Sequence, residues 1–151
     1  MSNWTPITEE SVKATKASTI LAKVRAMASA QGDADPLPEM IADVVATIRA
    51  SISVGNTLDV DQAKIPTSLK GLALRMVVRR VKDFCQLSLT EDERKQADDD
   101  RSYLNRIADH KIRFEAPDTP AGSAEMQSAG GVDVITASRR FADRETMNGL
   151  L

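Results

Sequence analysis

The sequence predicts an all-α protein, a small four-helix bundle followed by an extended C-terminal tail. Before Pro117, four segments carry apolar residues at helical spacing. Aromatic residues make up only 3% of the chain, which favours an aliphatic helical core over a sheet. After Pro117 the apolar residues are sparse, and proline, glycine and serine oppose regular packing. We therefore divide the 151 residues into a helical bundle, residues 1–116, and an interaction tail, residues 117–151.

The first predicted helix runs from Thr8 to about Ser29. Thr8 is a good N-cap, and the two acids after it complement the positive end of a helix. The helix carries a thin apolar stripe among many alanines: Val12, Ile20, Leu21, Val24 and Met27. Such a stripe permits close contact with other helices.

The second predicted helix has the strongest amphipathic pattern in the chain. Asp35 caps it, and Pro36 occupies the first position, where a missing N–H is harmless. Its apolar residues follow three- and four-residue spacing: Leu37, Met40, Ile41, Val44, Val45, Ile48 and Ile52. We expect it to end at Gly55-Asn56.

The third predicted helix begins at Ile65-Pro66, after a polar loop over residues 56–64. It offers a continuous apolar face: Leu69, Leu72, Ala73, Met76, Val77, Val81 and Phe84. This pattern predicts that the third helix packs with the second at the centre of the core. Cys85, the only cysteine, is expected to be a buried thiol in a reducing compartment.

The fourth predicted helix begins at the capping box of Thr90 and Glu93 and runs to about Asp109. Its apolar stripe is narrow, so one side should face solvent or a neighbouring subunit. Residues 110–115 and 132–135 alternate like short strands, which need a sheet edge from another element or another chain.

The residues for enzyme chemistry are few. His110 is the only histidine, which excludes a two-histidine metal site and a Ser-His-Asp triad, and we expect it to meet the last carbonyls of a helix. Asp59-Val-Asp61 lacks the glycine and glutamate of a calcium loop. Asp98-Asp-Asp100 is expected to be a solvated acidic face. The sequence therefore predicts no catalytic residue, no metal, no cofactor and no enzyme.

A basic row lies on the third predicted helix, where Arg75, Arg79 and Lys82 share one side. Such a row can contact phosphates or the carboxylates of a neighbouring subunit. The alternative is a solvated face whose arginine stems cover the edge of the core. Because the net charge is −2, no overall attraction to nucleic acid is expected.

The tail ends in a segment that suits binding to a partner. Phe141, Met147 and Leu150 are large apolar groups in a polar context. Arg139, Arg140 and Arg144 can pair with acidic groups beside them. We therefore expect these six residues to bind another protein.

The order of segments resembles a family of virion proteins. The resemblance rests on Ile7-Thr-Glu-Glu-Ser-Val12, Asp35-Pro-Leu-Pro-Glu-Met-Ile41, Asn56-Thr-Leu58, Ile65-Pro66, Leu89-Thr-Glu-Asp-Glu-Arg94, Leu104-Asn-Arg-Ile-Ala-Asp109 and Arg139-Arg-Phe141. These segments resemble the head-to-tail adaptor, or head-completion, proteins of long-tailed phages and Mu-like prophages. In one departure, Asp109-His-Lys111 stands where relatives often have Gly-Lys.

The resemblance implies a helical bundle that forms a homo-oligomeric ring, usually of twelve copies, beneath the portal. It implies that the tail binds the portal protein, that a further connector or stopper binds on the tail side, and that double-stranded DNA passes through the lumen. The protein would be made in the bacterial cytoplasm and end in the virion.

Two other functions remain open. One is a small helical DNA-binding regulator that uses Arg75, Arg79 and Lys82, and salt-dependent binding to duplex DNA would favour it. The other is a small hydrolase, which lacks an assembled nucleophile and base. No secretory signal and no membrane span are expected, so we predict a soluble protein.

Overall fold

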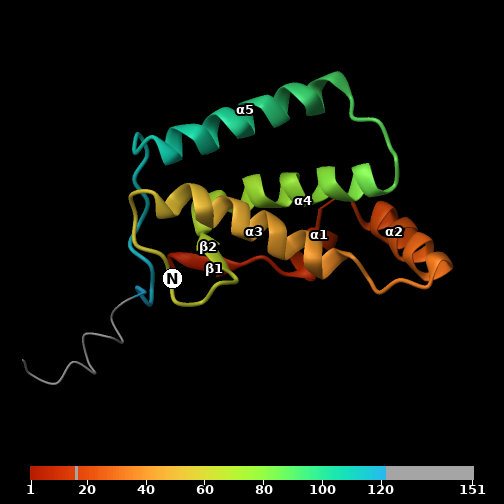
Figure 1. The fold of residues 1–151 in the computed structure, drawn as a ribbon, viewed down its shortest axis with the longest axis horizontal. Helices are drawn as coiled ribbons and strands as arrows, with labels where there is room; N and C mark the ends of the chain where they lie inside the picture. Colours follow the sequence, from red (N-terminus) through yellow and green to blue (C-terminus); the bar gives the residue numbers. More distant parts are fainter. Residues whose placement is uncertain (16, 122–151) are drawn as a thin grey trace, which may run out of the picture.

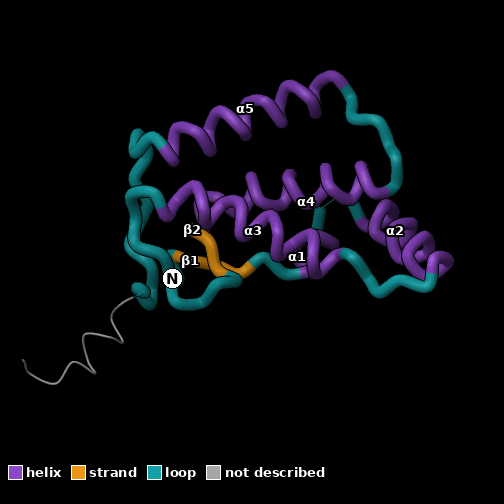
Figure 2. The backbone as a smooth tube through the Cα atoms, viewed as in Figure 1, coloured by secondary structure: helices purple, strands orange, loops and turns teal. Residues whose placement is uncertain are grey.

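The computed structural model describes residues 1–15 and 17–121 and is mostly helical (Figures 1 and 2). The described elements are β1 (Trp4–Pro6), α1 (Glu9–Lys13), α2 (Ser18–Gln31), α3 (Leu37–Ser53), β2 (Lys64–Pro66), a 3-10 turn (Thr67–Leu69), α4 (Lys70–Phe84) and α5 (Glu91–Ala108). In Figure 1, α4 and α5 run in opposite directions, and the N-terminus lies beside the chain that follows α5.

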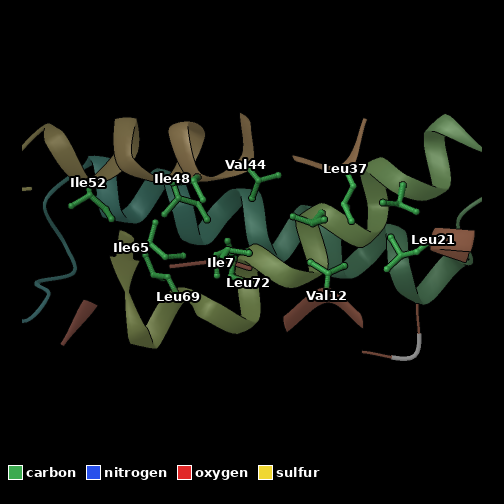
Figure 3. Packing of buried hydrophobic residues seen from close by; sticks show 14 of the residues in the cluster. Ile7, Val12, Leu21, Leu37, Val44, Ile48, Ile52, Ile65, Leu69 and Leu72 are labelled. Atoms are coloured by element: carbon green, nitrogen blue, oxygen red, sulfur yellow. The ribbon is translucent and has the colours of Figure 1, made fainter. Parts of the chain in front are cut away.

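The core lies between α3 and α4, which contact each other more extensively than any other pair of described elements. Ile48 and Ile52 of α3 and Val77 and Val81 of α4 are completely buried. Figure 3 shows the side chains of Val44, Ile48 and Ile52 in this packed layer. The predicted pairing of the second and third helices is therefore confirmed, and Cys85 is buried as predicted.

The single helix predicted from Thr8 to Ser29 was wrong, because α1 and α2 are separate. Val12 and Leu21 are both buried, yet their nine-residue separation places them on opposite faces of a straight helix. The chain must turn between them. Thr15 supports the turn, since its hydroxyl and its N–H both bond to the Val12 carbonyl, at 2.5 and 3.1 Å. The predicted N-cap is confirmed: Thr8 Oγ1 accepts the N–H of Ser11.

A two-stranded antiparallel sheet was absent from the sequence prediction. Strand β1 pairs with β2, with Thr5 opposite Ile65. Ile65 therefore lies in a strand and does not begin a helix, and α4 starts only at Lys70. Each strand has three residues, which is too short for alternation to be recognised in the sequence.

Trp4, the first residue of β1, belongs to the buried core. It is 1% exposed, and its indole Nε1 donates to the carbonyl of Glu115 at 3.2 Å. The guanidinium of Arg49 lies 5.9 Å from the ring centroid. The chain after α5 is thereby joined to the N-terminal strand.

The ends of α5 are fixed by local geometry. The predicted capping box is confirmed, with Thr90 and Glu93 bonded reciprocally. At the other end His110 adopts a left-handed conformation with φ 59°, and its N–H donates to the carbonyl of Ile107 at 3.0 Å. The backbone N–H of His110 therefore bonds to one of the last carbonyls of the helix. Its imidazole ring packs so closely against Gly55 that a Cβ atom at that position would overlap it. The end of α5 is therefore packed against the loop that follows α3.

Residues 110–115 do not form the predicted strand. Ile112 and Phe114 do turn toward the core and are partly buried, but no neighbouring strand pairs with them. Alternation here reflects burial of one side of an irregular segment. The second predicted strand, residues 132–135, lies outside the described residues.

The chain remains attached to the body beyond the boundary predicted at Pro117. The Asp118 carboxylate accepts bonds from the Ser2 hydroxyl and from the N–H groups of Asn3 and Trp4, the last two at 3.1 and 3.3 Å. The Ala121 N–H donates to the carbonyl of Leu58 at 2.8 Å. Residues 117–121 therefore belong with the body.

Candidate functional site

An ion-pair seam joins α4 to α5, and we define it as Arg75, Arg79 and Lys82 with Asp100 and Glu93. Arg75 Nη2 lies 2.6 Å from Asp100 Oδ1, and Arg79 Nη2 lies 2.6 Å from Asp100 Oδ2. Lys82 Nζ bonds to Glu93 Oε1. Arg75 and Lys82 are seven residues apart, as are Glu93 and Asp100, so two antiparallel helices bring both pairs together.

The seam corrects the interpretation of the basic row. Arg79 and Lys82 have side chains only 15% and 18% exposed, and each pairs with an acid of α5. Arg75 is more exposed, but it too contacts Asp100. The three cations are therefore neutralised within the chain, although contacts with DNA or a subunit remain a prediction.

Asp100 was wrongly placed on a solvated acidic face, since it is 5% exposed. Burial is the strongest single influence on its pKa and raises it, but the hydrogen bonds and charges of Arg75 and Arg79 together outweigh burial. Its pKa is therefore lowered, and the carboxylate is ionised near neutral pH. The hydrogen bond from Lys82 is the main cause that lowers the pKa of Glu93, with the Thr90 N–H second.

The segment with Asp59 and Asp61 has a structural role. The Asp59 carboxylate is buried and accepts the N–H groups of Asp61 and Thr119 at 2.9 and 3.1 Å. Arg49 of α3 donates to the carbonyls of Asp59, Asp61 and Lys64 at 2.7 to 3.0 Å. Over residues 1–15 and 17–121, no cluster of acids, histidine or cysteine suits a metal ion.

An apolar groove with a volume of about 880 Å³ runs along the outer side of α3. The groove is lined by apolar side chains of α3, of the loop after it and of the N-terminal segment: Ile7, Leu37, Pro38, Ile41, Ala42, Val45, Ala46, Leu58 and Ala63. Glu9, Asp43, Arg49 and Gln62 complete the lining. Leu58 is also the residue whose carbonyl holds Ala121, so the described chain ends beside this groove.

The groove has the chemistry of a binding surface. Three of its four polar lining residues have partners within the chain: Glu9 pairs with Lys13 and Arg25, Asp43 pairs with Arg80, and Arg49 donates to backbone carbonyls. The bonds from Lys13 and then Arg25 lower the pKa of Glu9 to about 2, so this carboxylate is a poor proton carrier near neutral pH. Sequence reasoning missed the groove, because its walls come from three separate segments.

The six tail residues predicted to bind a partner lie outside the described residues: Arg139, Arg140, Phe141, Arg144, Met147 and Leu150. The structure therefore places only the point from which their segment departs. In the part of the chain that the structure describes, no helix has the length and apolarity of a membrane span.

Comparisons of the chain with protein-family models, with curated proteins and with solved structures found no match.

Proposed function

We propose that the protein is a structural component of a phage virion, a head-to-tail adaptor. Copies form a ring, of about twelve, beneath the portal at the capsid vertex. The ring connects the capsid to the tail, its tail-side face receives the next connector or stopper, and DNA passes through its lumen. This proposal follows the resemblance of the sequence segments and is supported by the mostly helical body, after whose last described residue thirty residues of sequence remain, which we call the arm.

The observation that carries the proposal is the fixed departure point of the arm. Asp118 is hydrogen-bonded to residues 2–4 and Ala121 to Leu58, so the last thirty residues of the sequence follow a position that is attached to the body. In a ring, every arm then departs from an equivalent position. Weak contacts of each arm with the portal add together around the ring.

The arm carries groups suited to such contacts. Burying Phe141, Met147 and Leu150 on a portal surface contributes roughly 1.5 to 3 kcal/mol each before ordering costs. Arg139 and Arg140 pair with acidic groups and fix the orientation of the arm.

The ion-pair seam supports an adaptor better than a DNA-binding regulator. A regulator needs cations free to replace the counterions of phosphates. Arg79 and Lys82 are instead largely buried against Asp100 and Glu93. A near-neutral body also suits a channel through which DNA moves without adhering.

The test mixes the portal protein of the same phage with the full chain, with a truncation after Ala121 and with Phe141→Ala. Ser128→Ala is the control, a change in the same arm that removes no apolar anchor. Electron microscopy should show rings on portals with the full chain and the control, none with the truncation, and fewer with Phe141→Ala. Full occupancy by the truncated protein would show that the arm does not carry docking. Absence of portal binding by the full chain would refute the adaptor function itself.

A further inference from the structure

We infer that the apolar groove along α3 holds the chain's own C-terminal segment, residues 138–151, while the protein is unassembled. The inference concerns the isolated chain and does not depend on the portal as partner.

The floor of the groove suits apolar side chains from an extended segment. Ala42 and Ala46 are exposed positions of α3 that line the groove, and their small side chains leave room for the larger side chains of an occupant. The volume of about 880 Å³ lies in the range of pockets that hold drug-sized ligands. Among the residues after Ala121, the segment 138–151 contains Phe141, a methionine and two leucines.

The geometry of the chain brings this segment within reach. Ala121 is bonded to Leu58, a lining residue of the groove. Twenty residues separate Ala121 from Phe141, and a chain of that length reaches up to about 65 Å. Helix α3, with 17 residues, is only about 25 Å long. Any part of the groove is therefore accessible to the segment.

The tether favours this occupant over a second copy. A segment joined to the site by a short linker has an effective concentration on the order of millimolar. A second copy or a separate protein at micromolar concentration is at a disadvantage of about a thousandfold unless its affinity is much higher.

Charge at the groove also suits the segment. Asp43 is exposed, and its side chain keeps 56% of its accessible surface while paired with Arg80. An exposed pair of this kind is weak, so the carboxylate can take a second cation. Arg139 and Arg140 stand directly before Phe141, which places their charges beside the anchor that enters the groove.

As a consequence, the segment 138–151 stays in the groove until another surface binds it more tightly. In the adaptor proposed above, that surface is the portal, and release occurs because the portal binds the arm more tightly than the groove does.

The test compares the full chain with Ala42→Lys/Ala46→Lys, which fills the groove floor with charge at exposed positions. Ala26→Lys is the control, an exposed alanine of α2 that does not line the groove. Trypsin cleavage after Arg144, followed by mass spectrometry, measures access to the segment. If the segment is docked in about 80% of molecules, only about a fifth of them can be cleaved at any time. We therefore expect cleavage to be about fivefold faster in the groove variant and unchanged in the control. Phe141→Ala, which leaves the body untouched, should accelerate it as well.

A nitroxide attached at Ser138→Cys locates the docked segment in the full chain, because the native Cys85 is buried. Amide signals of Ala42, Ala46 and Ala63 should broaden within one molecule. Equal cleavage rates in all variants, or no selective broadening, would overturn the inference. Broadening seen only when labelled and isotope-enriched molecules are mixed would overturn it in favour of a second copy.

Discussion

Asp100→Ala should destabilise the protein, because one buried carboxylate holds two arginines of α4. Asp100 is 5% exposed and accepts bonds from Arg75 and Arg79, each at 2.6 Å through its closer nitrogen. The substitution removes the carboxylate and leaves the side chain of Arg79, 15% exposed, without this partner. The seam is thus the main polar link between α4 and α5.

The magnitude follows from burial. Removing one partner of a buried pair costs about 3 to 5 kcal/mol. Arg75, whose side chain is 41% exposed, can turn toward water, so the lower figure of about 3 kcal/mol applies. Alanine improves helix propensity by roughly 0.5 kcal/mol, which leaves a net loss of about 2.5 kcal/mol. For a chain of this size that lowers Tm by about 8 to 10 °C.

Urea unfolding followed by circular dichroism measures the change in free energy. Asp98→Ala, an exposed acid two positions away on the same helix, is the matched control and should change stability by less than about 0.5 kcal/mol. Arg79→Ala should cost more than Arg75→Ala, since its side chain is the more buried. A loss below about 1 kcal/mol for Asp100→Ala would refute the assignment of the seam as a stabilising link.

The stability difference between the parent and Asp100→Ala should depend on pH. The pKa of Asp100 is lowered from its ordinary value of 3.8, so its ionised form is favoured by folding. Its contribution is present above pH 3.8 and is lost as the pH falls through the lowered value. The difference in Tm between the parent and Asp100→Ala should therefore stay constant from neutral pH to about 5 and shrink below 3.8. A difference that disappears already at pH 6 would contradict this cause.

Two further predictions concern the core and the C-terminal boundary. Ile48→Asp places an unpaired carboxylate at a completely buried position and should unfold the body, which loss of the helical circular-dichroism signal would show. A variant that melts within a degree or two of the parent would contradict the assigned face. Truncation after Ala121 should leave Tm nearly unchanged, whereas truncation after Ala116 removes the bonds of Asp118 and Ala121 and should lower it by several degrees. Equal Tm values for the two truncations would show that residues 117–121 do not stabilise the body, and that the body ends before Pro117.

Local signals in the sequence were sufficient for the long helices. The apolar spacing of α3 and α4 and the capping box at Thr90 are properties of neighbouring residues, and they identified the central core correctly. The sequence also contained the reason for the division of the first helix, because Val12 and Leu21 cannot lie on one face of a straight helix. That spacing forces a break only if both side chains are buried, which the tertiary structure shows.

Tertiary structure alone decided the features that join distant segments. Trp4 reaches Glu115, Asp118 reaches Ser2, and Asp100 reaches Arg75, each across a separation that no local pattern reports. The spacing of the basic row placed its three residues on one face of a helix. That acids of α5 neutralise them could be known only from the tertiary structure. The sequence by itself determined which faces are apolar and where α1 and α5 begin. The fold determined which charges are neutralised and where the groove lies, because ion pairs and cavities depend on distances between elements.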